Sequence, residues 1–224
     1  MKKLNINTNG NKKLRNTDAL RFMIWNLPAV KTCPFRTPHC EQSCYARKAE
    51  RVYPQVLPSR EKNFAESLSD DFVENMIYTI KSELTRKKYN GKQVVFRIHE
   101  SGDFYNLEYT RKWVEIARHF ENRENLVFLA YTKSLSYVVI AGYNDPETFP
   151  KNFIVRSSLW DDTTERNREL TEDCQFPIYT ALSRSDMDTE RENGHKFTEC
   201  RCDDCARCGH CWNAEHREII VEIH

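Results

Sequence analysis

Long apolar runs are missing from this 224-residue chain. Residues 1–30 contain no apolar stretch of signal-peptide length, and no later segment is long and apolar enough to cross a membrane as a helix. We therefore expect a cytoplasmic protein without a membrane partner. Because thiols stay reduced in that compartment, clustered cysteines there indicate metal or redox sites rather than disulfides.

An excess of either charge is also missing. The chain has 34 Lys and Arg residues against 33 Asp and Glu residues, which gives a net charge of +1 and no evidence for a nucleic-acid partner. A local basic stretch with Lys12, Lys13 and Arg15 keeps nucleic-acid binding open as an alternative. With 39% hydrophobic residues, the chain can build a core without disulfides.

Linkers rich in proline, glycine or serine are absent as well, so we expect one compact unit. It would comprise an α/β domain over residues 1–195 and a cysteine-rich extension over residues 196–224 packed on it. The apolar patterns predict the following elements: strands within 20–30 and at 94–99, 126–132, 153–160 and 177–182, and helices at 69–84 and 107–120. The spacing of the strands leaves room for crossover helices, which predicts a parallel sheet, either open or a partial barrel.

The last four of these strands begin apolar and end polar. In parallel α/β folds the carboxyl ends of the strands line the ligand crevice, so we expect a shared site at that edge. Strand alternation places Arg97 and His99 on one face, where Arg156 and Ser158 of a later strand would join them. The alternative is that Arg97 and His99 only pair with a neighbouring carboxylate.

Cysteine, by contrast, is abundant: the chain has nine, and five lie in "CRCDDCARCGHC", residues 200–211. The spacing C-x2-C-x2-C-x2-C at Cys202, Cys205, Cys208 and Cys211 is typical of iron–sulfur cluster loops. Zinc is the alternative, although structural zinc sites usually separate two C-x2-C pairs by a longer loop. Whether Cys200, Cys202 or Cys174 completes this site stays open.

A second group of cysteines comprises Cys33, Cys40 and Cys44, spaced C-x6-C-x3-C. Three thiolates can hold three irons of a four-iron cluster and leave the fourth iron open to a small molecule. In the alternative, a closed site without chemistry, His39, His99 or Cys174 supplies the fourth ligand.

Four segments in order along the chain carry a family resemblance: "CPFRTPHCEQSCYARKAE", "RIHESGDFYNLEYTRKW", "AYTKS" and "CARCGHCW". Together they resemble the phage gene product 88 family of uncharacterised cysteine-rich proteins, from about residue 20 to residue 212. For a phage-encoded chain, the expected location is the cytoplasm of the host.

More distantly, the layout is similar to radical S-adenosylmethionine (SAM) enzymes, although their loop is C-x3-C-x2-C with an aromatic residue where Ser43 stands here. The resemblance implies two [4Fe–4S] clusters, an electron donor, and SAM bound at the open iron. It implies the following roles: Arg97, His99 and Asp103 catalytic; Ser101, Gly102, Asp103, Arg156 and Ser158 cofactor-binding. A two-cluster electron carrier without a ligand is a further alternative.

Overall fold

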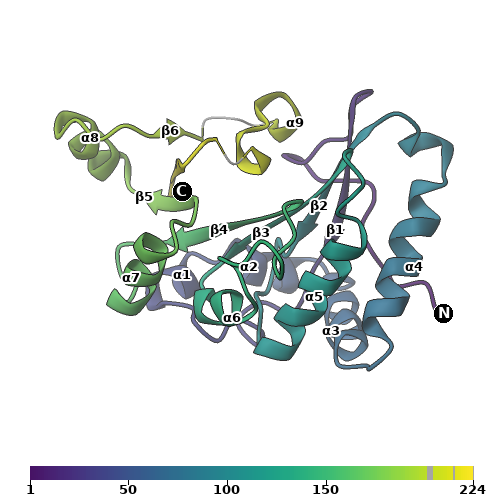
Figure 1. The fold of residues 1–224 in the computed structure, drawn as a ribbon. Helices are drawn as coiled ribbons and strands as arrows, with labels where there is room; N and C mark the ends of the chain where they lie inside the picture. Colours follow the sequence, from purple (N-terminus) through teal and green to yellow (C-terminus); the bar gives the residue numbers. More distant parts are fainter. Residues whose placement is uncertain (201–203, 214, 224) are drawn as a thin grey trace.

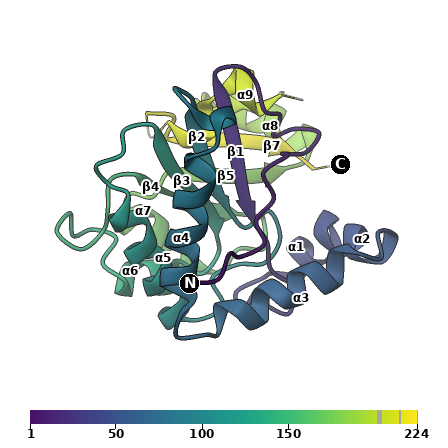
Figure 2. The same ribbon diagram turned by 90° about the vertical axis from the view of Figure 1, so that its right-hand side faces the viewer.

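The computed structural model describes residues 1–200, 204–213 and 215–223. Within them, seven strands form one sheet in the order β1-β2-β3-β4-β5-β7-β6, and every neighbouring pair is parallel. The strands are β1 (Leu20–Trp25), β2 (Gln93–Ile98), β3 (Leu126–Thr132), β4 (Phe153–Leu159), β5 (Ile178–Leu182), β6 (Thr198–Glu199) and β7 (Glu218–Glu222). The sheet is curled into half of a barrel, which confirms the predicted α/β class and partial barrel (Figures 1 and 2).

Helices connect the strands as the crossover spacing predicts. They are α1 (Pro38–Gln42), α2 (Tyr45–Val52), α3 (Val56–Ser67), α4 (Phe72–Leu84), α5 (Leu107–His119), α6 (Leu135–Ile140), α7 (Glu165–Asp173), α8 (Arg184–Glu192) and α9 (Cys205–Cys208), with 3-10 turns η1 (Lys87–Tyr89) and η2 (His210–Trp212). The two predicted helices correspond to α4 and α5. Helix α5 begins after Asn106, whose side chain accepts a hydrogen bond from the backbone N–H of Tyr109 at 2.8 Å.

The two faces of the sheet are covered differently. On the convex face, strand residues such as Trp25 and Phe96 pack against α4 and α5 through Phe72 and Trp113. The concave face carries a smaller apolar cluster that includes Phe22, Ile24, Val95 and Leu129. Helices α3, α5 and α6 lie on one side and α9 on the other in Figure 1. Apolar residues on both faces explain why the strands are continuous apolar runs.

Residues 196–224 also contribute strands to the sheet. Strand β7 pairs with β5 on one side and with β6 on the other, so this segment extends the half-barrel as well as covering its concave face. The division of the chain at residue 195 stays a prediction. In the described part of the chain, no helix combines the length and the hydrophobicity that crossing a membrane requires.

Candidate metal centre

The C-terminal cysteine loop lies against the concave face of the half-barrel. Cys205 and Cys208 begin and end α9, and Cys211 lies in η2. Gly209 between them has φ +72°, a left-handed conformation that turns the chain back after α9. Trp212 then packs edge-on against Phe22 of β1, with ring centres 5.7 Å apart, so the loop is held on the sheet by apolar contact.

Four described cysteines are gathered here: Cys200, Cys205, Cys208 and Cys211. Burial, with smaller contributions from the other three thiols, raises the pKa of Cys205 to about 12. Cys200 enters this group because its backbone N–H donates to the Ile220 carbonyl of β7 at 2.7 Å. We call these four residues the C-terminal cysteine group. Cys202, which the spacing predicts as a ligand, lies outside the described residues.

Arg156 of β4 holds this loop through its backbone. The side chain is fully buried. Its guanidinium donates to the carbonyls of Cys211 (2.7 Å), His216 (2.8 Å), Asn213 (2.9 Å) and His210 (3.0 Å). The sequence pattern predicts a cofactor-binding role for Arg156. The structure instead shows its donors engaged by the cysteine loop, which makes it a positioning residue.

The first cysteine group comprises Cys33, Cys40 and Cys44, in the segment that follows β1. Cys40 lies in α1, where its backbone N–H is capped by the Thr37 side chain, and Cys44 caps the start of α2. Burial, with smaller contributions from the negative charges of Asp103, Cys40 and Cys44, raises the pKa of Cys33 to about 12. The three thiols are therefore close enough to influence one another electrostatically.

The loop after β2 fixes the segment that carries Cys33. Ser101 donates its hydroxyl hydrogen to the Leu27 carbonyl at 2.8 Å. Gly102 has φ +86°, and a Cβ at this position would lie 2.6 Å from Leu27 Cβ and from Thr32 Oγ1. Glycine is therefore required for the close approach of the two loops. The expected role of Ser101 and Gly102 in cofactor binding stays a prediction, while their contacts show that they position the cysteine loop.

Asp103 is buried and bonded on both oxygens. Oδ1 accepts hydrogen bonds from Thr132 Oγ1 at 2.5 Å and from the Phe104 N–H at 2.7 Å, and Oδ2 accepts one from the Lys133 N–H at 3.0 Å. Burial raises the pKa of Asp103 above its usual range, which these hydrogen bonds oppose. The carboxylate thus ties the ends of β2 and β3 together beside the first cysteine group.

His99 does not share a face with Arg97, contrary to the prediction from strand alternation. Strand β2 ends at Ile98, and His99 has φ +65°, which turns its side chain to the convex side. There its Nε2 is hydrogen-bonded to Tyr109 Oη at 2.9 Å, and burial lowers its pKa to about 3. A neutral imidazole in the helix-side core does not line the same space as Arg97, so the prediction that the two side chains share a face is wrong.

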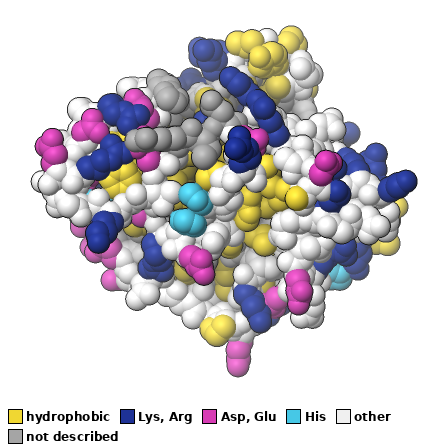
Figure 3. All heavy atoms as spheres, turned by 90° about the horizontal axis from the view of Figure 1, so that it is seen from above, with side chains coloured by type: hydrophobic (Ala, Val, Ile, Leu, Met, Phe, Trp, Pro, Cys, Tyr) yellow, Lys and Arg dark blue, Asp and Glu magenta, His cyan; other side chains and the backbone are white. Residues whose placement is uncertain are grey.

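Arg97 lies beside the C-terminal cysteine group. Its guanidinium stacks on Tyr131 of β3 at 3.6 Å from the ring centre, and its charge lowers the pKa of both Cys205 and Cys211, opposing the larger effect of burial. Tyr131 in turn packs edge-on against Tyr179 of β5, with ring centres 4.6 Å apart. Figure 3 shows the face above this region, where lysines and arginines surround a central group of hydrophobic side chains.

His39, His99 and Cys174 could each supply a fourth ligand by sequence alone. In the structure, none of the three side chains points freely toward the first cysteine group. His39 is exposed, and its Nδ1 is hydrogen-bonded to Asp161 at 2.7 Å, which raises its pKa. His99 lies in the convex core, as described, and Cys174 packs against that same core. Within the described residues, the first group therefore has three cysteine ligands to offer.

Lys133 is the site residue that the sequence pattern misses. It follows the last residue of β3 and is only 6% exposed. Its ammonium donates to Ser158 Oγ at 2.9 Å and lies 5.7 Å from the centre of the Trp160 ring, and its charge lowers the pKa of the Cys40 thiol against the larger effect of burial. The polar end "YTKS" of the strand signals this position, but it does not indicate which residue turns inward.

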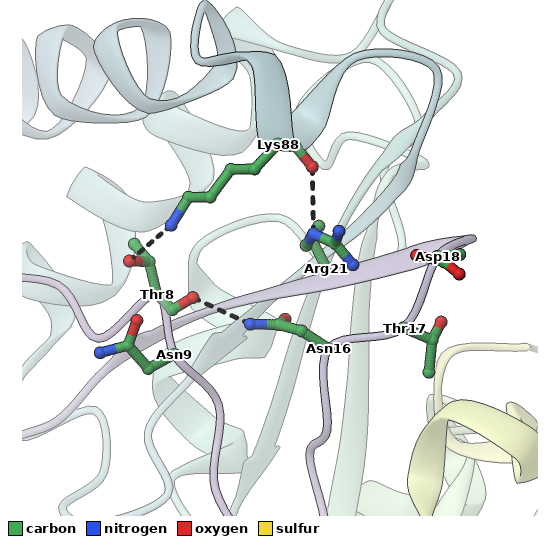
Figure 4. A pocket seen from close by; sticks show the side chains of 7 residues that line it. All are labelled: Thr8, Asn9, Asn16, Thr17, Asp18, Arg21 and Lys88. Carbon is green, nitrogen blue, oxygen red and sulfur yellow. Dashed lines mark hydrogen bonds between the residues drawn. The ribbon is translucent and has the colours of Figure 1, made fainter.

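A polar pocket of about 570 Å³ lies at the opposite, amino-terminal edge of the strands (Figure 4). Its two cations are already engaged by the protein. Lys88 Nζ donates to Thr8 Oγ1 at 3.0 Å, and Arg21 Nε donates to the Lys88 carbonyl at 3.0 Å. No cysteine lines this pocket, so it is separate from the candidate metal centre.

The fold and the site define an α/β half-barrel protein with two separate groups of cysteines at its concave side and carboxyl edge. The chain belongs to the gene product 88 family, since the family model "Gene product 88" matches residues 2–214. It is similar to the "Gene 88 protein" of Mycobacterium phage D29, with 28% identity over 205 residues that cover 81% of this chain and 78% of that protein. No solved structure matches the chain.

Proposed function

We propose that this chain is an iron–sulfur protein that binds two [4Fe–4S] clusters. The first cysteine group would hold one cluster by three thiolates, and the C-terminal cysteine group, Cys200 included, would hold the other by four. Two observations support this proposal: the charges that surround the cysteines and the spacing of their sulfur atoms.

The main support for the proposal is the positive charge of the side chains that lie near the cysteines. Lys133 lies beside the first cysteine group, and Arg97 and Arg156 lie beside the C-terminal group; Lys133 and Arg156 are buried, and none of the three forms an ion pair with a carboxylate of the described residues. Buried cations are costly unless an anion compensates them. Cysteine thiolates and the clusters they hold carry net negative charge, so ligation at both groups would supply the missing anions.

The sulfur spacing favours a cluster over a single zinc ion. Thiolates that share one zinc ion lie about 3.8 Å apart, given a zinc–sulfur bond of about 2.3 Å and tetrahedral angles. Across the described ranges, no three cysteine sulfurs lie within 4.8 Å of one another. A [4Fe–4S] cluster binds each thiolate through a different iron, and therefore needs sulfurs that are farther apart.

The first cluster would keep one iron open, because the described residues near it supply three thiolates and Asp103 is already fully hydrogen-bonded. A small molecule is the natural occupant of that position. When bound, such a cluster supplies single electrons to its ligand. We propose SAM as that ligand, in a reaction of the radical SAM type that an electron donor serves. The alternative is an electron carrier that binds no small molecule. Nucleic-acid binding through Lys12, Lys13 and Arg15 stays a prediction.

The test is oxygen-free purification followed by measurement of iron, sulfide and zinc. We expect about eight irons and eight sulfides per chain, and about half of each in Cys44→Ala and in Cys208→Ala. Zinc without sulfide, or no metal, would contradict the proposal. An unchanged electron paramagnetic resonance (EPR) spectrum of the first cluster on addition of SAM would contradict the proposed SAM-dependent activity. It would not contradict the binding of the two clusters.

A further inference from the structure

We infer that the polar pocket at the amino-terminal edge of the strands binds a phosphate group of a nucleic acid, and that Arg21 and Lys88 are its anion-binding residues. The pocket lies at the edge opposite the cysteine groups, so this binding is independent of the proposed clusters. The starting observation is a surplus of positive charge in two segments that meet there.

The positive charge of this nearly neutral chain is concentrated at that edge. Residues 1–21 contain six Lys and Arg residues and one acidic residue, and residues 86–92 contain four Lys and Arg residues and no acidic one. Hydrogen bonds join the two segments: Lys88 Nζ donates to Thr8 Oγ1 at 3.0 Å, and Arg21 Nε donates to the Lys88 carbonyl at 3.0 Å. The edge therefore presents a local field that attracts anions, although the net charge of the chain does not.

One carboxylate serves three of these cations. Glu83 lies 2.6 Å from Lys3 Nζ and 3.0 Å from Arg86 Nη1. Lys88 Nζ is farther away, at 4.0 Å, and Arg21 forms no ion pair with the described residues. Burial and the charges of Arg86 and Arg21 lower the pKa of Lys88, which the charge of Glu83 opposes. A bound anion would relieve this repulsion between cations.

The hydrogen bonds inside the pocket orient the two cations and leave further donors. A lysine ammonium has three N–H donors and a guanidinium has five. Lys88 Nζ gives one to Thr8, and Arg21 gives two to the carbonyls of Lys88 and Leu20, the second at 3.1 Å. No described residue accepts from Arg21 Nη2. Because these acceptors are neutral, both side chains keep their charge for a ligand, and charge-assisted hydrogen bonds to phosphate are the strong ones.

The lining of the pocket favours a phosphate over a base or an apolar ligand. The space is about 570 Å³, and its lining residues are all polar: Thr8, Asn9, Asn16, Thr17, Asp18, Arg21 and Lys88. None of these side chains offers an aromatic or aliphatic face on which a base could stack. Lys, Arg, Asn and Thr are the side chains that commonly contact phosphate. The one acidic residue, Asp18, lies on the other side of the pocket from the Lys88 ammonium (Figure 4).

The loop beside the pocket favours a nucleic acid over a free nucleotide. Asn16 Nδ2 donates to the Thr8 carbonyl at 3.0 Å and closes the loop between them. Lys12, Lys13 and Arg15 lie in this loop, are exposed and form no ion pair with the described residues. A nucleic-acid backbone with one phosphate in the pocket would offer its next phosphates to these cations, whereas a single nucleotide would use the pocket alone.

The experiment measures binding of a labelled oligothymidylate of about 20 nucleotides by fluorescence anisotropy, over about 50 to 200 mM KCl. The full-length protein is purified without oxygen. We expect affinity that falls steeply as the salt concentration rises. Arg21→Gln and Lys88→Gln should each weaken binding about three- to tenfold and reduce the slope of log K against log salt by about 0.7, the loss of one phosphate contact. Lys88→Arg should keep most of the affinity.

Further variants separate a binding defect from a folding defect. Asn9→Asp places a negative charge in the pocket at an exposed side chain and should weaken binding as the two glutamine variants do. Lys151→Gln removes an exposed lysine elsewhere and should bind as the parent does. Thermal unfolding shows which variants are folded. Parent-like binding by the folded pocket variants, Asn9→Asp included, overturns the inference, and so does affinity that does not depend on salt.

Competition distinguishes the sources of the phosphate. Unlabelled oligothymidylate should displace the probe at a far lower phosphate concentration than ATP or inorganic phosphate does. Equal displacement by ATP would assign the pocket to a free nucleotide, and equal displacement by polyglutamate would assign the binding to general attraction of polyanions. Either result overturns the inference. Iron and sulfide contents of the same samples show separately whether the cluster proposal stands.

Discussion

Arg156 Nε donates a hydrogen bond to the backbone carbonyl of Cys211 at 2.7 Å, which connects the middle of the sheet to a cysteine of the C-terminal group. The same guanidinium reaches the carbonyls of His210, Asn213 and His216. One side chain thus fixes the backbone on both sides of the cysteine, and the geometry of the C-terminal group depends on a residue that is not a ligand.

Arg156→Met should therefore remove the C-terminal cluster and leave the first one. Four backbone carbonyls lose their charged donor, and leaving them unpaired in a buried place costs several kcal/mol, about 3–5 by analogy with other broken buried pairs. Iron and sulfide should fall to about half under oxygen-free conditions. Arg166→Met, which removes an exposed arginine of α7, is the matched control. Full iron content in Arg156→Met would show that the loop holds its shape without the arginine.

Cys200→Ala should remove the C-terminal cluster, whereas Cys202→Ala should retain it. Cys200, Cys205, Cys208 and Cys211 offer the four thiolates that one cluster requires, and the β6–β7 pairing brings Cys200 to the other three. Iron per chain and the EPR spectrum distinguish the variants. Cys174→Ser is the control, because Cys174 packs in the convex core and should keep both clusters. Loss of iron in Cys202→Ala with retention in Cys200→Ala would reverse the assignment.

The sequence was sufficient to predict five of the seven described strands, because apolar runs are local signals, but not β6 and β7. The shared site at the carboxyl ends of the strands stays a prediction. The sequence was not sufficient for His99, where a single left-handed residue after β2 sends the side chain to the other face. It left the choice among Cys200, Cys202 and Cys174 open and missed Lys133 for a different reason. The places of Cys200 and Lys133 depend on the pairing of β6 with β7 and on hydrogen bonds of the Lys133 backbone with Asp103 and Asn167, all of which join residues from different elements.

Gly102→Ala should destabilise the protein and lower the iron content of the first site. The substitution places a Cβ 2.6 Å from Leu27 Cβ and from Thr32 Oγ1 at a left-handed position, which costs about 2–5 kcal/mol from crowding and backbone strain together. Gly91→Ala is a strict control: it has φ +65° but nothing within 4 Å of the new Cβ, so only strain of about 1 kcal/mol remains. Thermal unfolding of both variants measures the difference. Similar midpoints for the two would show that the loops after β1 and β2 are not tightly packed.

His195 should stabilise the protein more at acidic than at alkaline pH. Its Nδ1 and Nε2 lie 2.8 Å from carboxylates of Glu190 and Glu218, so both nitrogens donate only when the ring is protonated, and these partners raise its pKa. The contribution is fully present below the unfolded-state pKa of about 6.5 and is lost as the pH rises through the higher folded-state pKa. The side chain is 39% exposed, so the effect should be below about 1 kcal/mol. The melting temperatures of the parent and His195→Gln should differ at pH 6 and converge at pH 9; a difference that does not depend on pH would contradict this.

Tyr131→Phe should lower the reduction potential of the C-terminal cluster. The Tyr131 hydroxyl lies beside the Cys211 thiol, where its O–H as a donor lowers the thiol pKa against the larger effect of burial. Donors to a ligand sulfur stabilise the more negative, reduced form of a cluster, so removal of the hydroxyl favours the oxidised form. The phenylalanine keeps the ring on which Arg97 stacks and the edge-on contact with Tyr179, so the packing is preserved.

Tyr179→Phe is the matched control, with a smaller expected shift, because Tyr179 is coupled to Cys211 by charge alone. Redox titration followed by EPR gives both potentials, and an equal shift in the two variants would assign the effect to the polarity of the region rather than to one hydrogen bond.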